Sequence, residues 1–225
     1  MNVLVACEFS GVVREAFRKR GHNAFSCDFL PAADGRWDLH YTGNALDLLP
    51  APKNIVPRGL RLPNHWDLLI AHPTCTYLCN SGVHLLVKTP KNPGPNTLHG
   101  SKRMAAMKEA CTLFNAFLLA PIPKICVENP IMHGYARALI AEDYAQIIQP
   151  HQFGHDASKQ TCLWLKGLPK LIPTKNIPPK IVNGRKIWGN QTPSGQNKLG
   201  PSADRWAKRS ITYQGIADAM AEQWG

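Results

Sequence analysis

Three short groups of residues in this sequence have the types and spacing that chemistry would need, and the first of them contains Cys75. The apolar run Trp66–Ala71 predicts a buried strand, and Cys75 lies just beyond its carboxyl end, where α/β sheets place reactive groups. The following stretch, His72–Gly100, is long for a loop inside a compact domain, which predicts a binding loop or lid. A thiolate there can act as a nucleophile, although a buried structural thiol is the commoner fate of a cysteine.

The second group is Glu128-Asn129-Pro130, which follows the apolar run Lys124–Val127 and so also stands at the end of a predicted strand. A carboxylate at this place can hydrogen-bond a heterocycle and, if burial raises its pKa, donate a proton. The alternative interpretation is the beginning of a helix, which Asn-Pro would suit well.

The third group is Phe9-Ser10-Gly11, a turn between a predicted strand and a predicted helix. Such a turn directs backbone N–H groups and the positive end of the helix dipole toward a ligand, and Gly11 would let that ligand approach the backbone. Asp28 ends the next predicted strand, where nucleotide-binding folds place the carboxylate that binds ribose hydroxyls. An ordinary turn between a strand and a helix is the alternative, because this motif alone is weak.

The elements that would position these groups alternate between strands and helices, which is typical of a nucleotide-binding α/β fold. The sequence predicts a strand at Asn2–Cys7, a helix that ends at Gly21 and a second strand at His22–Cys27. Apolar runs and helical periodicity predict further strands and helices at Trp66–Ala71, Ser101–Leu119, Lys124–Val127, Thr161–Leu165 and Ile211–Trp224. Leu30–Asn64 predicts loops around one short turn, and Ile181–Trp188 predicts a hairpin.

Taken in order, the three groups resemble the cytosine-C5 DNA methyltransferase family. Where that family reads F-x-G-x-G, P-C-Q and E-N-V, this sequence has Phe9-Ser10-Gly11, Pro73-Thr74-Cys75 and Glu128-Asn129. Further segments are similar to the F-S-x-A-G block, the Y-G-x-P-Q-x-R-x-R segment and the C-terminal helix of the family: Leu78–Gly82, Phe153–Thr161 and Thr212–Trp224. The chain looks like a compact, phage-type branch of these enzymes.

This resemblance implies a Rossmann-like sheet that binds S-adenosylmethionine and transfers its methyl group to C5 of cytosine. Cys75 would add to C6 of the base, and Glu128 would hydrogen-bond N3 and the exocyclic amine. Because a stacked base cannot react, double-stranded DNA would have to flip its cytosine into the site. The implied catalytic residues are Cys75, Glu128 and Lys159, and the implied cofactor-binding residues are Phe9, Ser10, Gly11, Asp28, Asn44 and Pro73.

The sequence also departs from the family pattern. Val13 replaces the second glycine of the first block, Thr76 replaces the glutamine after the nucleophile, and Lys159 with Thr161 replaces an arginine pair. Lysine cannot reproduce the forked hydrogen bonding of arginine. Two alternatives therefore stay open: a C5-methyltransferase of pyrimidine nucleotides or RNA, and a catalytically inactive nucleic-acid-binding protein of the same fold.

The positive charge is concentrated toward the C-terminal end of the chain. The formal net charge is +11, and residues 151–225 hold 11 Lys and Arg against 4 Asp and Glu. Residues 166–208 are predicted to be a reduced target-recognition region, and residues 1–165 with 209–225 the catalytic and cofactor-binding domain. The predicted nucleic-acid contacts combine cations with aromatic rings and are Lys170, Arg185, Lys186, Trp188, Lys198 and Arg205. A solvated surface with core tryptophans is the alternative; so short a region predicts a short or relaxed recognition sequence.

The composition excludes several classes of protein. With 44% hydrophobic and 18% charged residues, the chain is neither disordered nor fibrous. Seven cysteines without a C-x-x-C pair indicate reduced thiols, and Cys75, Cys79 and His72 are too few for a metal site, so we expect no metal. We expect no signal peptide, no membrane span and a cytoplasmic location in a bacterial host cell. The oligomeric state and the biological role, restriction-modification among the possibilities, are not indicated by the sequence.

Overall fold

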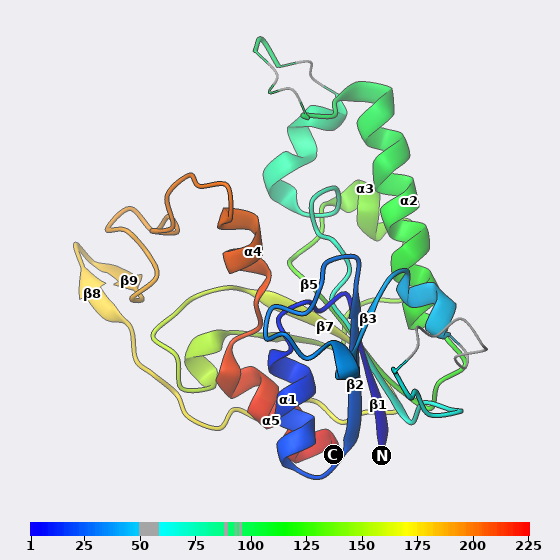
Figure 1. Cartoon of the computed structure of the whole chain (residues 1–225). Coiled ribbons are helices and arrows are strands. Elements are labelled where there is room, and N and C mark those ends of the chain that lie inside the picture. The colour runs from blue at the N-terminus through cyan, green and yellow to red at the C-terminus, as the bar shows by residue number, and fades with distance from the viewer. Residues whose placement is uncertain (50–58, 88–89, 93, 95) are drawn as a thin grey trace.

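The computed structural model describes residues 1–49, 59–87, 90–92, 94 and 96–225, and they form a seven-stranded sheet with helices on both faces (Figure 1). The strand order is β3-β2-β1-β4-β5-β7-β6. The strands are β1 (Asn2–Ala6), β2 (Asn23–Asp28), β3 (His40–Thr42), β4 (Leu68–Ala71), β5 (Lys124–Asn129), β6 (Gln146–Ile148) and β7 (Thr161–Lys166). Neighbouring strands from β3 to β5 pair in parallel, whereas β7 is antiparallel to both β5 and β6.

The central strands bring the ends of β1, β4 and β5 to one edge of the sheet. β1 and β4 are continuous apolar runs because both of their faces are covered. Ala71, the last residue of β4, pairs with Ala6 on one side and with Val127 on the other. The residues that follow these positions, His72 and Glu128 among them, therefore lie side by side at the carboxyl edge.

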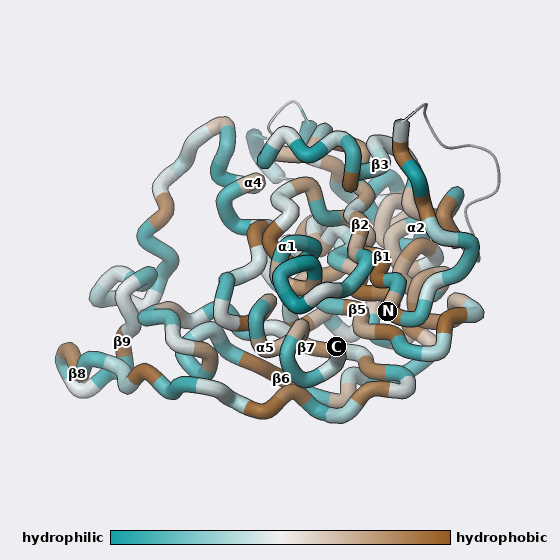
Figure 2. Tube along the Cα trace, turned by 60° about the horizontal axis from the view of Figure 1, so that its bottom comes forward, coloured by the Kyte–Doolittle hydropathy of each residue, from teal (hydrophilic) through white to brown (hydrophobic). Residues whose placement is uncertain are grey.

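Two hydrophobic layers enclose the sheet. Phe17 of α1 (Val12–Lys19) and Trp224 of α5 (Gln214–Trp224) are in the core on one face. Phe114 of α2 (Gly100–Leu118) and Ala136 of α3 (Gly134–Arg137) are in the core on the other. Figure 2 shows the apolar strands running between α1 and α2.

The segment before α5 extends away from the sheet. It carries the hairpin β8 (Lys180–Val182) and β9 (Arg185–Ile187) and the short helix α4 (Arg205–Ser210), which lie on the left of Figure 1. Asn183 and Gly184 join the two strands with φ angles of 49° and 73°, the left-handed conformation that a two-residue hairpin turn of this kind requires. The predicted hairpin is therefore confirmed.

The predicted α/β fold class with a Rossmann-like sheet is confirmed, but several short elements were missed. The structure adds β3, β6, α3, α4 and the 3-10 helices η1 (Trp37–Leu39), η3 (Asn80–Leu86) and η4 (Pro150–Gln152), whereas η2 (Ala45–Leu48) is the one short turn expected within Leu30–Asn64. Interpreting Leu30–Asn64 as loops with one turn was wrong for β3, because this three-residue strand has no apolar run and is specified by pairing with β2. Parts of this region and of the predicted loop His72–Gly100, namely residues 50–58, 88–89, 93 and 95, lie outside the described residues.

A search of the described residues for a helix both long enough and apolar enough to cross a bilayer found none.

Candidate functional site

The most closely organised group at the carboxyl edge is the pair His72 and Glu128. His72 Nδ1 lies 2.8 Å from Glu128 Oε2, and the two side chains are only 11% and 12% exposed. Adjacent parallel strands position them, since His72 follows β4 and Glu128 lies near the end of β5. His72 Nε2 is buried without a hydrogen-bond partner among the described residues.

The pair is held in its charged form. Burial opposes ionisation of Glu128, but the hydrogen bond and charge of His72, helped by Lys159, lower the pKa of this carboxyl below its usual value. Burial likewise opposes protonation of His72, but Glu128 and the more distant Glu8 raise the pKa of the imidazole. The sequence-based expectation that burial might raise the pKa of Glu128 is therefore wrong for this structure, because the histidine outweighs burial.

Cys75 belongs to a pair of cysteines one turn apart. Cys79 N donates to the Cys75 carbonyl over 3.1 Å, and the two thiols lie within hydrogen-bond reach of each other. This hydrogen bond and burial raise the pKa of Cys75, while Lys159 acts in the opposite direction. The Cys75 thiol lowers the pKa of Cys79 to about 5 against the effect of burial, and Ser81, whose Oγ is 3.1 Å from Cys79 Sγ, acts in the same direction. The pair therefore shares one ionisation, and the negative charge resides mainly on Cys79.

The turn that carries the cysteines is tied to its surroundings from three sides. Asn129 Nδ2 donates to the Pro73 carbonyl over 2.9 Å, and Arg103 of α2 donates to the Thr76 carbonyl over 3.0 Å. His133 N donates to the Leu78 carbonyl over 3.0 Å. Hydrogen bonds thus connect the first part of the predicted loop His72–Gly100, which carries Cys75, to the surrounding elements.

Lys159 reaches the same edge from the segment before β7. Its Nζ donates to the Arg209 carbonyl over 3.0 Å, and its charge lowers the pKa of both Cys75 and Glu128. A small cavity of about 10 Å³, close to the volume that one water molecule needs, lies between Glu128, Lys159 and neighbouring residues of β6, β7 and α5. The three predicted catalytic residues, Cys75, Glu128 and Lys159, therefore lie together.

The predicted cofactor turn, Phe9-Ser10-Gly11, lies at the same edge between β1 and α1. Gly11 has a φ angle of 74°, and a Cβ there would lie 2.5 Å from Arg14 Nη2, so its own backbone and packing already require glycine. Glu8 accepts hydrogen bonds from Val13 N over 2.7 Å and from Arg14 N over 3.2 Å. The expectation that these helical N–H groups face a ligand is therefore wrong, because a buried carboxylate of the chain already caps them.

The other predicted cofactor residues occupy the neighbouring strand ends. Asp28 ends β2, and its backbone carbonyl accepts a 2.9 Å hydrogen bond from Gly43 N, which brings Asn44 to the same place. Asn44 Oδ1 caps η2 by accepting from Leu46 N over 3.1 Å. Pro73 is buried directly after His72.

The chemistry of this donor set fits S-adenosylmethionine better than a phosphate ligand. Asp28 supplies a carboxylate that would accept hydrogen bonds from hydroxyl or ammonium groups and would repel a phosphate. Phe29, directly after Asp28, is 75% exposed and offers a ring face on which a heterocycle can stack.

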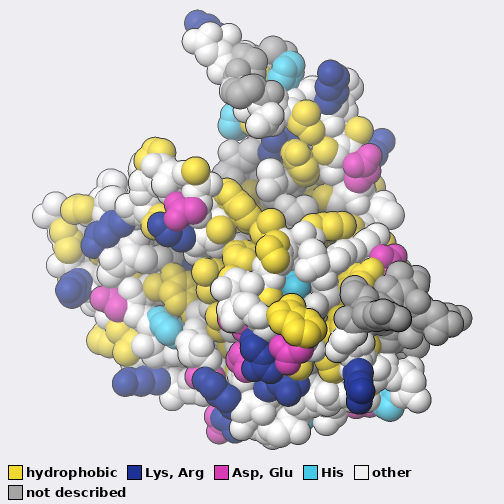
Figure 3. Space-filling model, viewed as in Figure 1, with side chains coloured by type: hydrophobic (Ala, Val, Ile, Leu, Met, Phe, Trp, Pro, Cys, Tyr) yellow, Lys and Arg dark blue, Asp and Glu magenta, His cyan; other side chains and the backbone are white. Residues whose placement is uncertain are grey.

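The predicted nucleic-acid residues lie mainly in the extended segment. Arg185 and Lys186 are exposed on β9, and Trp188 stacks on His151 with ring centroids 4.5 Å apart. Lys198 and Arg205 each donate to a backbone carbonyl over 2.9 Å. In Figure 3, basic side chains are scattered over the left lobe, which contains β8, β9 and α4. The surface is hollowed between this lobe and the upper lobe, which contains η3 and the beginning of α2.

Lys170 is separated from the other predicted nucleic-acid residues. Because β7 runs antiparallel to β5, the chain after Lys166 emerges at the amino edge of the sheet, opposite the cysteines. There Trp224 Nε1 of α5 donates to the Pro169 carbonyl over 3.1 Å. The beginning of the predicted recognition region, 166–208, therefore packs on the helix assigned to the catalytic domain.

Helix α4 connects the basic segment with the candidate site. The ring of Trp206 lies 6.2 Å from that of Phe9, centroid to centroid, and is 58% exposed. The Arg209 carbonyl at the same helix accepts the hydrogen bond from Lys159. A ligand held by α4 would consequently lie beside both the predicted cofactor turn and the predicted catalytic residues.

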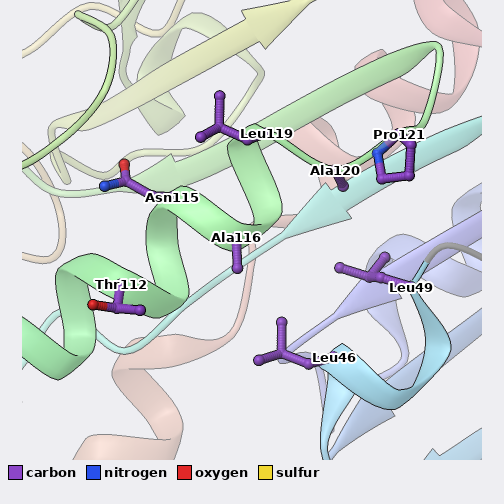
Figure 4. Close-up of a pocket in the computed structure, with 8 residues that line it drawn as sticks. All are labelled: Leu46, Leu49, Thr112, Asn115, Ala116, Leu119, Ala120 and Pro121. Atoms are coloured by element: carbon purple, nitrogen blue, oxygen red, sulfur yellow. The ribbon is translucent and has the colours of Figure 1, made fainter.

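An apolar hollow lies elsewhere. It has a volume of about 370 Å³ and lies between η2 and the C-terminal part of α2, where Leu46 and Leu49 face Ala116 and Leu119 (Figure 4). Its two polar side chains are Thr112 and Asn115. Asn115 donates a hydrogen bond to the Leu139 carbonyl and accepts one from Ala141 N. This apolar hollow has no group suited to catalysis.

Two residues of the site, His72 and Glu8, were missed as functional residues. His72 was considered only as a metal ligand, and among the described residues no group of three or more His, Cys, Asp or Glu is arranged to hold a metal ion. The only available signal was position, since each is a polar residue directly beyond an apolar strand. Which partner each would meet depends on the neighbouring strands.

Comparison with known proteins gives a limited result. No protein-family model matches the chain, and no curated protein matches it. Among solved structures, it is similar to one from E. coli described as a "putative DNA modification methyltransferase encoded within prophage", with 14% sequence identity and a TM-score of 0.47. The match covers 81% of this chain and 53% of the other, so the chain spans about half the length of that structure. A TM-score below 0.5 carries no argument about the activity of this chain.

Proposed function

We propose that the chain is an S-adenosylmethionine-dependent DNA methyltransferase that modifies C5 of cytosine through a covalent bond between Cys75 and C6 of the base. The observation that carries the proposal is the convergence of a thiol, a carboxylate and an ammonium group at the carboxyl edge, beside a turn lined by carboxylates. The resemblance of the motifs to the cytosine-C5 family gives the reaction in which such a group would act.

Cys75 supplies the nucleophile. Its S–H proton passes to the thiolate of Cys79, and the sulfur forms a bond to C6 while the electron pair of the C5–C6 double bond moves toward C5 and N3. Lys159 favours this step because its positive charge stabilises negative charge on the cysteine pair. The turn holds the sulfur in place through its three tethers.

Glu128 binds the base. Oε2 is engaged by His72, and Oε1 has no hydrogen bond from the described residues, so it can accept one from the exocyclic amine or from a protonated N3. Holding N3 in its protonated form stabilises the adduct, in which C5 has become electron-rich.

S-adenosylmethionine, held by Asp28, Phe29 and the turn at Phe9, would supply the methyl group to C5. Loss of the C5 proton to a base then allows the Cys75–C6 bond to break, which returns the thiolate and restores the aromatic ring.

The partner that we propose is double-stranded DNA. Figure 3 shows the surface hollowed beside the part of the molecule that carries the hairpin, and Arg185 and Lys186 of that hairpin are exposed. Cationic side chains would contact the phosphates, and the target cytosine would have to leave the stack to reach Cys75.

The decisive experiment is to incubate the protein with unmethylated plasmid DNA and methyl-labelled S-adenosylmethionine and then to identify the labelled nucleoside. Label in 5-methylcytosine supports the proposal, and label in another nucleoside contradicts it. Parallel reactions with RNA and with cytidine nucleotides test the alternative substrates. Calorimetry with S-adenosylmethionine separates the methyltransferase hypotheses, which require binding of this cofactor, from the alternative of an inactive nucleic-acid-binding protein, which does not.

A further inference from the structure

His72 has no role of its own in the proposed chemistry. Its Nδ1 is 2.8 Å from Glu128 Oε2, and both side chains are almost completely buried. A histidine that serves only the architecture would be expected to use both ring nitrogens to join segments of the chain. Nε2 of His72, however, is buried without a partner among the described residues.

His133, close by, shows the architectural arrangement. Its Nδ1 accepts a 3.1 Å hydrogen bond from Ala136 N, and its Nε2 lies 3.0 Å from the Tyr77 carbonyl, so it joins two segments of backbone. The one polar side-chain contact of His72 in the described chain is instead with Glu128. The two histidines therefore differ in what they hold: His133 joins two segments of backbone, whereas His72 contacts a carboxylate.

We propose that His72 is the positioning residue of Glu128: it keeps the carboxylate ionised and oriented so that Oε1 is left to accept an N–H group of the substrate. The effect of His72 on catalysis rests on the proposed function, whereas its effect on the ionisation and orientation of the Glu128 carboxylate does not. The charged groups that act on His72 are Glu128 from β5, Glu8 from the turn after β1 and Lys159 from the segment before β7. The two carboxylates favour the imidazolium, and Lys159 opposes it.

The substitutions His72→Asn and His72→Leu separate the hydrogen bond from the charge. The amide nitrogen of asparagine can replace Nδ1 as a donor to Glu128 but carries no charge, whereas leucine removes both. His65, an exposed histidine before the other end of β4, provides the control substitution His65→Leu. Thermal unfolding identifies any variant that fails to fold.

The first measurement is a pH titration of Glu128. Carbon-13 NMR of the side-chain carboxyl groups detects it, and Glu128→Gln identifies the signal of this residue. In the wild-type protein and in His65→Leu, Glu128 should titrate below the ordinary range of a glutamate. In His72→Leu, burial opposed only by the charge of Lys159 should move its titration above that range, and His72→Asn should give an intermediate result. An unchanged titration of Glu128 in folded His72→Leu, or in His72→Asn if the leucine variant does not fold, would overturn the proposal.

The second measurement is the pH profile of kcat/KM for methyl transfer to plasmid DNA. At pH 7, His72→Leu should lose about tenfold to a hundredfold of activity and recover part of it as the pH rises, because ionised Glu128 becomes more abundant. A purely structural role would lower activity equally at all pH values and would contradict the proposal. If the wild-type protein transfers no methyl group, the proposed function fails, while the titration of Glu128 still decides the role of His72.

Discussion

The carboxyl edge of the sheet and the basic segment around β8 and β9 use charge in opposite ways. At the edge, His72 and Glu128 are buried, in contact and almost inaccessible to solvent. On the hairpin, Arg185 and Lys186 are exposed and belong to no ion pair between described residues. Buried charges interact strongly and need fixed partners, whereas exposed charges are screened by salt and interact through their number.

This difference separates two tasks that the proposed enzyme must perform. Chemistry on one atom requires groups that rigid strands hold in place, and the edge provides them on β4 and β5. Contact with a polyanion of varying sequence requires cations on a surface that can follow its backbone, and the hairpin provides those. Substitutions in the two regions should therefore change different measured quantities.

The largest effect is expected for Cys75→Ser at the edge. A serine hydroxyl is a far weaker nucleophile than a thiolate, so methyl transfer should fall by at least about a thousandfold. Labelled transfer to plasmid DNA measures this, and the dissociation constant for DNA should change little. Cys79→Ser is the matched control and should cost less; the opposite ranking of the two variants would identify Cys79 as the nucleophile.

Glu128→Gln should have the next largest effect. The amide keeps the shape of the side chain but has no negative charge with which to stabilise a protonated N3. We therefore expect kcat to fall by about a hundredfold to a thousandfold. Single-turnover kinetics with saturating DNA would measure the chemical step. A loss confined to DNA affinity would contradict a role at the base and would remove the distinction between the two regions.

The double substitution of Arg185 and Lys186 by alanine tests the basic segment. DNA affinity should fall by about tenfold at moderate salt, and the slope of log K against log salt should decrease by about 2, because two phosphate contacts are lost. Fluorescence anisotropy over a salt series measures both quantities. Lys170→Ala is the control, because Lys170 lies at the opposite edge of the sheet; an equal loss there would show that the contact surface is not confined to the hairpin.

The smallest effect expected is a dependence of stability on pH from the pair at the edge. Because the pKa of Glu128 is lowered in the folded protein, its contribution is present above its ordinary pKa and is lost as the pH falls through the lowered value. Because the pKa of His72 is raised, its contribution is present below its ordinary pKa and is lost as the pH rises through the raised value. His72→Asn should reduce the free energy of unfolding by about 1–2 kcal/mol between these limits, as measured by urea unfolding at several pH values. A loss that is independent of pH would mean that the pair does not carry opposite charges.

Much of the fold could be predicted from the sequence because the central strands are continuous apolar runs. Val3, Val5, Leu69 and Ile70 are fully buried, and runs of this kind between polar turns are typical of parallel strands. The short strands β3 and β6 could not be predicted, since each has three residues and is specified by the strand beside it. The antiparallel direction of β7 was equally hidden, and it removes Lys170 from the surface to which the sequence assigned it.

The candidate site divides in the same way. Cys75, Glu128 and the turn at Phe9 could be identified because each follows a strand that the sequence makes evident. The partners that set their charge could not be identified, because the residue pairs His72–Glu128 and Cys75–Lys159 are each separated by more than fifty positions in the sequence. Glu8 illustrates the limit: in the sequence it is only the residue after the predicted strand Asn2–Cys7, but in the structure it caps the helix that follows.

The sequence by itself determined the identity of the chemical groups and their order along the chain, because apolar periodicity and the residues that end each strand are local properties. The tertiary structure alone decided which of these groups meet, because the pairing of β4 with β5 brings His72 beside Glu128 and the return of the chain before β7 brings Lys159 to both Glu128 and Cys75. Ionisation depends on burial and on neighbouring charges, and both are properties of the assembled sheet.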